Sequence, residues 1–184
     1  CMSRQAFAAI SEAYDVSGFA EIVDVGGNRG TLAVDLLAHY PQLKATIFDL
    51  PPVIDVAEEA LEGHPARERL TFARGSFFEE VPAGADAYLL KHILHDWPDK
   101  DCRRILRTVR EAIPDDGTLL VFDSVLVPEA PPWAVWLDVH MMILQDGKER
   151  TPDEFVELFA ESGFSLNRAH SIPAPVAIIE AQPA

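Results

Sequence analysis

The sequence predicts an α/β protein in which parallel strands form one sheet with helices on both faces. From residue 20 onward, short apolar runs alternate with stretches whose apolar residues recur at helical spacing. This alternation indicates parallel strands, because a parallel pair needs a crossover connection that is usually a helix. The apolar runs are almost unbroken, as expected for strands covered on both faces.

The first part of the chain carries four predicted strands and three predicted helices. The strands lie at 20–26, 44–50, 70–76 and 86–92, and the helices at 31–40, 51–61 and 98–113. Pro51 and Pro52 suit a first helical turn, where a missing N–H leaves no hydrogen bond unmade. Asp99 and Asp101 lie near the start of their helix, where the helix dipole favours negative charge.

The remaining residues predict, in order, a strand at 117–126, a loop at 127–132, a helix at 133–147, a helix at 151–163 and a strand pair at 164–183. Thr151 is the expected N-cap of the last helix, and Gly163 ends it. A Pro-containing turn joins the final two strands, which we expect to form a hairpin at the end of the sheet.

Composition limits the classes of protein that the chain can be. A length of 184 residues with 48% apolar and 24% charged residues suits one globular domain. The net charge of −15 argues against nucleic acid as a partner and indicates a solvated acidic surface. No apolar run approaches the ~20 residues of a membrane helix, so no membrane partner is expected. The two cysteines, Cys1 and Cys102, predict reduced thiols and a cytoplasmic protein.

Residues 1–18 predict a helix that arrives from elsewhere, with apolar positions at Phe7, Ile10 and Tyr14. A start at cysteine rather than methionine suggests a fragment of a longer protein. The expected organisation is therefore a linker helix at 1–18 and one domain at 19–184.

A glycine-containing turn, "VDVGGNRG", joins the first strand to the first helix. Ligands of open α/β sheets bind beyond the carboxyl ends of the strands, and glycines there let a ligand approach the backbone. A simple tight turn is the alternative. A dinucleotide G-x-G-x-x-G beginning at Gly26 would need glycine where Asn28 and Thr31 stand, which argues against NAD and FAD. The P-loop pattern is absent as well.

Asp49 ends the second strand, about twenty residues beyond the glycine turn. A carboxylate at that place suits hydrogen bonds to ribose hydroxyls, although it could simply cap the helix that follows. The glycine turn and Asp49 together indicate a cofactor that contains a nucleoside.

Five segments, "VDVGGNRG", "FDLPPV", "GSFF", "LLKHILHDWPD" and "DGKERT", occur in an order that resembles S-adenosylmethionine-dependent O-methyltransferases of the caffeic-acid type. This family includes bacterial enzymes that act on aromatic polyketides. The resemblance covers nearly all of residues 3–182, and "HDWPD" with "GKERT" is its specific part. It implies a Rossmann-like seven-stranded sheet whose last strand is antiparallel. It also implies a missing N-terminal domain that makes the full-length protein a homodimer.

By resemblance, S-adenosylmethionine is held by Asp24, Gly26, Gly27, Asp49, Leu50, Ser76, Phe77 and Lys91. The backbone at Gly26 would face the methionine part and Asp49 the ribose, with Leu50, Ser76 and Phe77 around the adenine. The chain departs from many members at Asn28, where they have a third glycine. Plant members have aspartate in place of Ser76, which can still hydrogen-bond adenine with less charge assistance.

The expected chemistry needs a base, because a phenol with a pKa near 10 is protonated at neutral pH. Histidine suits this task, and His95 follows the fourth strand at the ligand-binding edge. The resemblance supplies Asp123 and Glu149 as its carboxylate partners. Asp123 is one methylene shorter than the glutamate of plant members, so we expect either a longer hydrogen bond to the imidazole or a reorganised pairing.

The other polar residues of this stretch have structural alternatives. His92 is expected to be scaffold, on the strand face opposite Lys91. Asp96 would orient the loop, cap the next helix or bind a substrate hydroxyl, and Trp97 would pack. We predict no metal site, because His92 and His95 face opposite sides of an extended chain and no ligand set supports them.

The helix at 133–147 aligns with the acceptor wall of the family. Its candidate substrate residues are Trp136, His140, Met141 and Ile143, of which His140 and Met141 stand out. Methionines offer an adaptable apolar surface to a planar ring. The alternative is an ordinary helix stripe packed in the core.

The leading hypothesis is methyl transfer to an aromatic hydroxyl of a small secondary metabolite, phenolic or polyketide, with His95 as the general base. A second hypothesis is a module that binds the cofactor but is inactive without its N-terminal domain. A third is a family member repurposed for hydroxylation or decarboxylation. Binding without turnover would favour the second, and product analysis separates the third.

Overall fold

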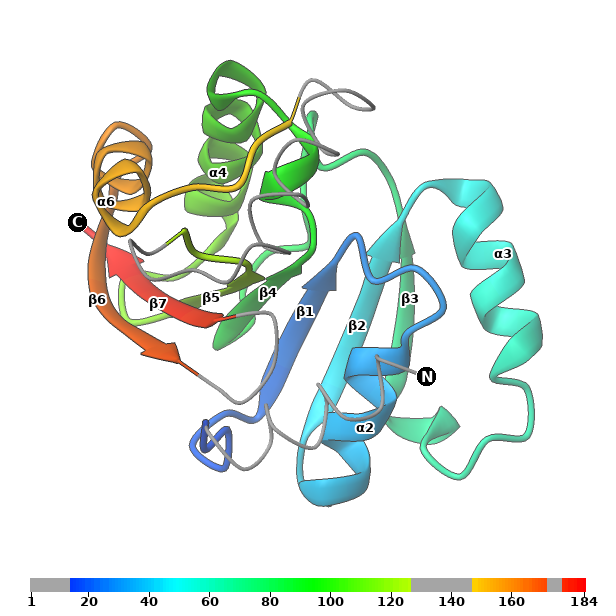
Figure 1. The fold of residues 1–184 in the computed structure, drawn as a ribbon. Coiled ribbons are helices and arrows are strands. Elements are labelled where there is room, and N and C mark those ends of the chain that lie inside the picture. Colours follow the sequence, from blue (N-terminus) through cyan, green and yellow to red (C-terminus); the bar gives the residue numbers. More distant parts are fainter. Residues whose placement is uncertain (1–13, 127–146, 172–176) are drawn as a thin grey trace.

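The computed structural model describes residues 14–126, 147–171 and 177–184. Seven strands form one mixed sheet in the order β3-β2-β1-β4-β5-β7-β6 (Figure 1). The strands are β1 (Glu21–Val25), β2 (Lys44–Asp49), β3 (Leu70–Arg74), β4 (Ala87–Lys91), β5 (Thr118–Asp123), β6 (Phe164–Ser171) and β7 (Ala177–Pro183). The α-helices are α2 (Thr31–His39), α3 (Pro51–Ala60), α4 (Asp99–Ala112) and α6 (Pro152–Ala160), with 3-10 turns η1 (Arg67–Arg69) and η2 (Leu94–Asp96).

The strand order reverses at β1, which lies between β2 and β4. All three strands are parallel, with Val25 opposite Phe48 on one side and Leu90 on the other. Connections leave β1 and β4 toward opposite halves of the sheet, and a crevice therefore opens between their carboxyl ends. This is the place where the sequence predicts a ligand.

The C-terminal strands complete the sheet in the antiparallel sense, as predicted. β7 pairs antiparallel with β5, and β6 pairs antiparallel with β7, with a shift in register between Leu166 and Arg168. The antiparallel pair therefore closes the sheet beside β5, which confirms the expected C-terminal hairpin.

Side chains of the central strands alternate between two apolar cores, one on each face of the sheet. Val23 and Val25 belong to the core beneath α4 and α6, whereas Ile22 belongs to the core beneath α2 and α3. β4 alternates in the same way, since Leu90 joins the first core and Leu89 the second. Both faces are covered because successive strand residues point in opposite directions. The almost unbroken apolar runs of the sequence have this cause.

The predicted cap of the last helix is confirmed, whereas that helix ends at Ala160, three residues before Gly163. Thr151 accepts a hydrogen bond from the Glu154 N–H, and Glu154 in turn accepts one from the Thr151 N–H, which completes a capping box at the start of α6. Gly163 has a φ of +82° after that helix. The predicted loop at 127–132 and nearly all of the helix at 133–147 lie outside the described residues. So does most of the helix at 1–18, and residues 14–18 contain no helix.

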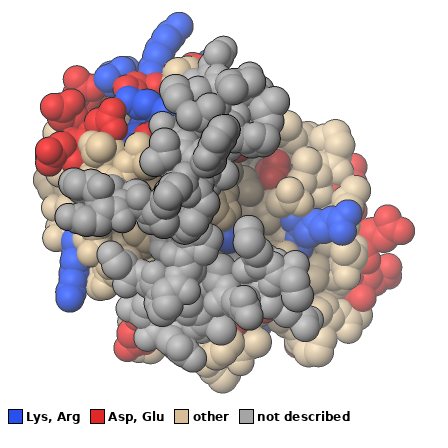
Figure 2. Space-filling view, viewed as in Figure 1, with Lys and Arg blue, Asp and Glu red and all other residues tan. Residues whose placement is uncertain are grey.

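Acidic side chains on this face gather over α3 and over the side of α4 and α6 (Figure 2). Exposed carboxylates on separate helices are consistent with a solvated acidic surface. Among the described helices, none combines the length and the apolar character needed to cross a lipid bilayer.

Candidate active site

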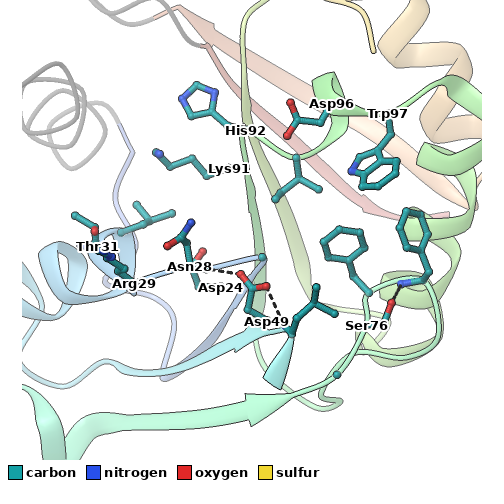
Figure 3. Close-up of a pocket in the computed structure, with 18 residues that line it drawn as sticks. Asp24, Asn28, Arg29, Thr31, Asp49, Ser76, Lys91, His92, Asp96 and Trp97 are labelled. Carbon is teal, nitrogen blue, oxygen red and sulfur yellow. Dashed lines mark hydrogen bonds between the residues drawn. The ribbon is translucent and has the colours of Figure 1, made fainter. Parts of the chain in front are cut away.

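A cavity of about 640 Å³ lies beyond the carboxyl ends of β1, β2 and β4 (Figure 3). Its walls come from the glycine turn, the loop after β3 and the segment that follows β4. All eight residues predicted for the cofactor line this cavity. They are Asp24, Gly26, Gly27, Asp49, Leu50, Ser76, Phe77 and Lys91. The topology thus brings together residues from four separate segments of the chain.

The glycine turn is shaped by packing within the protein as well as by access to the cavity. Gly26 and Gly30 have φ of +69° and +71°, and Asn28 reaches +51°. A Cβ at Gly26 would lie 2.5 Å from the Ile93 Cδ1 atom, and one at Gly30 would lie 2.2 Å from the Ile47 Cδ1 atom. Both alternatives for this turn therefore apply, because Gly26 borders the cavity whereas Gly30 serves the tight packing of the turn.

Asp49 ties the end of β2 to the glycine turn. Its Oδ2 atom accepts the Asn28 N–H at 3.0 Å, and its Oδ1 atom accepts the Leu50 N–H at 2.7 Å. These bonds hold the carboxylate at the cavity wall. Each carboxylate oxygen can accept a second hydrogen bond, so ribose hydroxyls could still be bound.

Asp24 contributes a buried carboxyl group beneath the turn. Its Oδ2 atom has no hydrogen-bond partner among the described residues. Burial raises the pKa of Asp24 to about 7, against the lowering effect of the Lys91 charge and the Ala33 N–H. Burial also disfavours the charged form of Lys91 and lowers its pKa, although the charges of Asp24 and Asp123 act in the opposite direction. The protonation of Asp24 and of Lys91 at the floor of the cavity therefore depends on burial and on the charges of their neighbours.

Three aromatic rings form one wall of the cavity. Phe78 lies edge-on to both Phe77 and Trp97, with ring centroids 4.9 and 4.8 Å away. Ser76 precedes these rings, and its Oγ atom accepts the Phe78 N–H at 3.3 Å. Trp97 packs, as predicted, and it also lines the cavity.

His95 is held by a buried glutamate from a distant part of the chain. Its Nδ1 atom lies 3.2 Å from Oε1 of Glu149, and its Nε2 atom lies 3.4 Å from Oδ1 of Asp96. Burial disfavours the charged ring, but the Glu149 hydrogen bond and the charges of Asp123, Glu149 and Asp96 outweigh it. The pKa of His95 is therefore raised above its usual 6.5. Asp96 lines the cavity, whereas His95 is not among its lining residues.

Of the two alternatives for the shorter Asp123, a longer hydrogen bond to His95 or a reorganised pairing, the structure shows the second. Both of its oxygens are buried without a hydrogen bond to any described residue. Oδ1 instead lies 3.9 Å from Nδ1 of His92. The shortened side chain does not reach a hydrogen-bond position on His95, but its charge still acts on that ring. Burial, with Glu149 and Asp96 nearby, raises the pKa of Asp123 to about 7.

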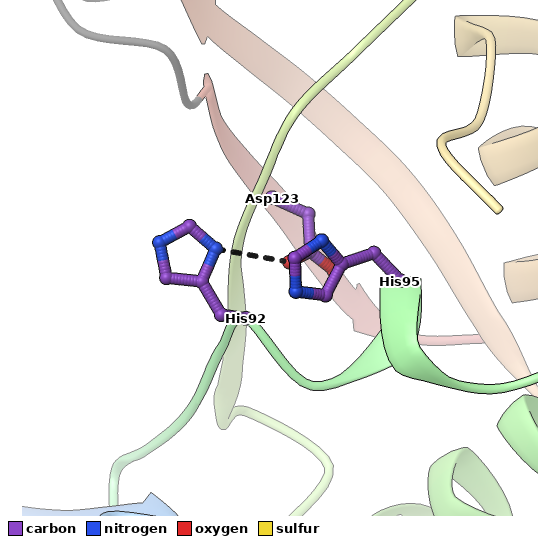
Figure 4. A group of neighbouring side chains, drawn as sticks. All are labelled: His92, His95 and Asp123. Carbon is purple, nitrogen blue, oxygen red and sulfur yellow. Dashed lines mark ion pairs between the residues drawn. The ribbon is translucent and has the colours of Figure 1, made fainter. Parts of the chain in front are cut away.

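The expectation that His92 and His95 face opposite sides is wrong. His92 has a φ of +53°, and the 3-10 turn η2 follows, so this segment is not extended. The two rings lie 5.2 Å apart between centroids, and His92 lines the cavity. With Asp123 they form a group whose ligand atoms all lie within 4.8 Å of one another (Figure 4). The geometric reason for excluding a metal site therefore fails.

Arg150 and Gly147 are structural residues of the site that the sequence reasoning did not single out. Arg150 is 1% exposed and donates to the carbonyls of Leu94 and Trp97 at 2.8 and 2.9 Å. It also forms an ion pair with Asp99 at 2.8 Å. The sequence did contain a signal for Arg150. The segments "HDWPD" and "GKERT" occur together in the family, and in the structure Arg150 of the second segment binds the backbone of the first.

Gly147 lies directly against the backbone of the histidine segment. A Cβ there would lie 2.0 Å from the His95 carbonyl oxygen. A side chain would push the two segments apart. The predicted acceptor residues Trp136, His140, Met141 and Ile143 lie outside the described residues, so their arrangement stays a prediction.

Comparison with known proteins places this arrangement in a family. Residues 3–165 match the O-methyltransferase domain. The chain is 40% identical to a mitomycin biosynthesis 6-O-methyltransferase of Streptomyces lavendulae over 172 residues, which are 93% of this chain and 49% of that protein. It is also 40% identical to the phenazine O-methyltransferase PhzM of Lysobacter antibioticus, covering 98% of this chain and 53% of that protein.

Solved structures agree with these similarities. The crystal structure of LaPhzM superposes with a TM-score of 0.95 at 39% identity, covering 99% of this chain and 55% of that one. The O-methyltransferase NcsB1 from neocarzinostatin biosynthesis, in complex with S-adenosylmethionine and 2-hydroxy-5-methyl naphthoic acid, gives 0.88 at 34% identity, covering 96% and 53%. The chain spans about half the length of the curated relatives that it matches.

Proposed function

We propose that this chain, which belongs to the O-methyltransferase family, transfers a methyl group from S-adenosylmethionine to a hydroxyl on a small aromatic metabolite. The observation that carries the proposal is the His95–Glu149 pair beside the cavity at the reversal point of the sheet. A buried carboxylate on one imidazole nitrogen prepares the other nitrogen to accept a proton.

The charges around the cavity support this cofactor. S-adenosylmethionine carries a sulfonium, an ammonium and a carboxylate group, and its net charge is positive. The cavity is lined by the carboxyl groups of Asp24, Asp49 and Asp96 and by the cations of Arg29 and Lys91. The acidic groups of this lining are complementary to the sulfonium and ammonium charges of the ligand.

The residues present also suit the separate parts of the cofactor. We assign the ribose hydroxyls to Asp49, whose carboxylate is already oriented by two backbone N–H groups. The adenine is assigned to Leu50, Ser76 and Phe77, where an aromatic face can stack on the base. The methionine part is assigned to the Gly26–Gly27 backbone, with Asp24 and Lys91 beneath it.

The protein's chemical task is to position the acceptor and remove its proton, because the bound cofactor supplies a methyl group that is already activated. Glu149 accepts a hydrogen bond from the Nδ1–H of His95, which leaves the lone pair on Nε2 for the acceptor hydroxyl. As the proton moves to Nε2, the charges of Glu149 and Asp123 stabilise the imidazolium. A raised pKa brings the base closer to the phenol's own pKa, and proton transfer therefore becomes easier.

Asp96 is assigned to the acceptor side of the site. Its Oδ1 atom lies 3.4 Å from Nε2 of His95, the nitrogen that would receive the proton. From there it can accept a hydrogen bond from an acceptor hydroxyl and direct it toward the base. We assign the rest of the acceptor wall to Trp136, His140 and Met141.

The class of acceptor follows from the relatives. The names of the similar proteins mention mitomycin, phenazine and a naphthoic acid, which contain fused or substituted aromatic rings. We infer a planar aromatic acceptor of similar size with a free hydroxyl group.

The direct test incubates the purified protein with S-adenosylmethionine and a panel of phenols, naphthols and hydroxyphenazines, and detects methylated products by mass spectrometry. His95→Ala should reduce turnover by about 100-fold or more, the usual contribution of a general base. His39→Ala is the matched control, because His39 is an exposed histidine on α2. A loss smaller than about tenfold for His95→Ala would reject the base assignment.

A module that binds the cofactor without methylating an acceptor is the alternative function, because the chain spans about half the length of its relatives. The resemblance implies an N-terminal domain that dimerises and closes the acceptor site. Calorimetry with S-adenosylhomocysteine measures cofactor binding independently of turnover. Binding without methylation of any acceptor would support a cofactor-binding module, and methylation by these 184 residues would reject it.

A further inference from the structure

We propose that His92, His95 and Asp123 form a binding site for a transition-metal dication, with Zn²⁺ as the best-suited ion (Figure 4). The three side chains come from the segment after β4 and from the end of β5. Their candidate ligand atoms all lie within 4.8 Å of one another.

Strand register brings the ligands together. Lys91 pairs with Phe122 across β4 and β5, and the His92 N–H donates to the Phe122 carbonyl at 3.0 Å. His92 and Asp123 are therefore adjacent at the same edge of the sheet. The left-handed backbone at His92 and the 3-10 turn η2 then bring His95 back over them.

The distances are close to those of a bound ion. The Nδ1 atom of His92 lies 3.9 Å from Oδ1 of Asp123. Around a tetrahedral Zn²⁺ with bonds of about 2.1 Å, ligand atoms are about 3.4 Å apart. Side-chain rotations that bring the three ligand atoms closer together would complete the site.

Polar atoms of the group lack other partners among the described residues. Both oxygens of Asp123 and the Nδ1 atom of His92 are buried without a hydrogen bond. Asp123 is 0% exposed, so leaving its carboxyl group unpaired is costly. A cation between these atoms would satisfy the carboxylate and the imidazole lone pair at once.

The surrounding charges also favour a dication. The carboxylates of Glu149 and Asp96 act on Asp123, as do the cations of His95 and Arg150. Arg150 is already paired with Asp99, and Lys91 acts on both Asp123 and His92. With His95 neutral, Glu149 and Asp96 add negative charge beside Asp123, and the nearby cations are Lys91 and an arginine that is already paired, so a bound dication would be stabilised.

The donor set selects the type of ion. Two imidazole nitrogens and one carboxylate oxygen suit Zn²⁺ and its neighbours in the first transition row. Mg²⁺ and Ca²⁺ prefer oxygen ligands and are disfavoured. Three protein ligands leave one coordination position for water, as in open zinc sites.

Occupancy has a consequence that rests on the proposed function. A neutral imidazole has one nitrogen lone pair, because the other nitrogen carries hydrogen. A metal bound to His95 takes that lone pair, whichever nitrogen it uses. His95 could then no longer accept the acceptor's proton, and the metal should inhibit methyl transfer.

The test of binding uses the protein after dialysis against a chelator. Zn²⁺ is titrated by calorimetry, and Co²⁺ by its visible d–d absorption, which becomes intense in four-coordinate sites. We expect one ion per chain. His92→Asn should weaken Zn²⁺ binding by more than the ~10- to 100-fold typical of outer-shell changes. His39→Asn is the matched control and should bind as the wild type does.

Asp123→Asn provides the second variant, because it removes the anionic ligand with little change in shape. Circular dichroism checks the fold of Asp123→Asn. If Asp123→Asn does not fold, the Zn²⁺ affinity of His92→Asn decides the test. Unchanged Zn²⁺ affinity in folded His92→Asn would overturn the proposal, and so would the absence of one-to-one binding by the wild-type protein.

Activity gives a separate readout. Zn²⁺ should inhibit methylation reversibly, with activity restored by a chelator. If Zn²⁺ binds at this site without inhibiting an active enzyme, the base assignment fails while the metal site stands. If the protein has no methylation activity, calorimetry and the Co²⁺ spectrum still decide the metal site.

Discussion

The carboxylate of Glu149 lies 3.2 Å from Nδ1 of His95, although 54 residues separate the two in the chain. Glu149 is 2% exposed, so its interaction with the ring is little screened by solvent. In the proposed chemistry, this pair determines which imidazole nitrogen accepts the proton.

Glu149→Gln tests this pair through the pH dependence of methylation. A base must be deprotonated to act, so the wild-type rate should rise with pH through the raised pKa of His95, above 6.5. The substitution removes the hydrogen bond and charge that raise this pKa. The rising limb should therefore move to lower pH, and turnover should fall by at least about tenfold. Glu157→Gln, at an exposed position on α6, should change neither.

Arg150→Met tests the attachment of the "HDWPD" segment. It leaves the carbonyls of Leu94 and Trp97 without their donor and leaves Asp99 without this ion pair. We expect a loss of about 2–4 kcal/mol in the free energy of unfolding, measured by urea denaturation, mainly from the two carbonyls left without a donor. Lys148→Met removes a partly exposed partner of the same aspartate and should cost at most about 1 kcal/mol. Equal losses for the two variants would contradict the structural role of Arg150.

Gly147→Ala tests the close approach behind the base. The new Cβ would meet the His95 carbonyl oxygen at 2.0 Å, so the backbone must shift. We expect a destabilisation of about 1–3 kcal/mol together with reduced turnover. Gly18→Ala is the control, because a Cβ there meets nothing within 4 Å. A fully active and stable Gly147→Ala protein would show that this contact is unimportant.

Asp49→Asn tests the assigned ribose contact. Both carboxylate oxygens accept backbone N–H groups, and an asparagine amide nitrogen cannot accept a hydrogen bond. The affinity for S-adenosylhomocysteine, measured by calorimetry, should fall by about 10- to 100-fold. Asp153→Asn, at an exposed position on α6, is the control. Undiminished affinity in Asp49→Asn would reject the contact.

Asp24→Asn tests the buried carboxyl group through stability. The pKa of Asp24 is raised from 3.8 to about 7 by burial, so the folded state holds this proton more tightly than the unfolded state. The resulting stability is full below pH 3.8 and is lost as the pH rises to about 7. Asparagine does not titrate. The variant should therefore gain about 2 kcal/mol relative to the wild type between pH 5.5 and pH 8, by urea unfolding. A difference that does not change with pH would contradict the raised pKa.

Local signals explain why the elements could be predicted. The apolar run that became β1 and the Thr151 cap of α6 depend on residues within a few positions of one another. The residues around the cavity were named mainly through the family resemblance, and their meeting at one edge agrees with the way parallel strands bring their carboxyl ends together. The orientation of His92 was not found, because nothing in its neighbourhood indicated a left-handed backbone in a non-glycine residue.

By itself, the sequence determined the succession of strands and helices along the chain and the ligand edge marked by the glycine turn and Asp49, and its resemblance to a family supplied the other residues around the cavity. Only the tertiary structure decided how the polar side chains pair. The register of β4 against β5 places Asp123 beside His92, and the bridge between Val125 and Arg150 brings Glu149 to His95. The physical reason is the distance along the chain over which each kind of interaction acts. Periodicity, caps and turns act over a few residues, whereas these contacts depend on where distant segments meet to within an ångström.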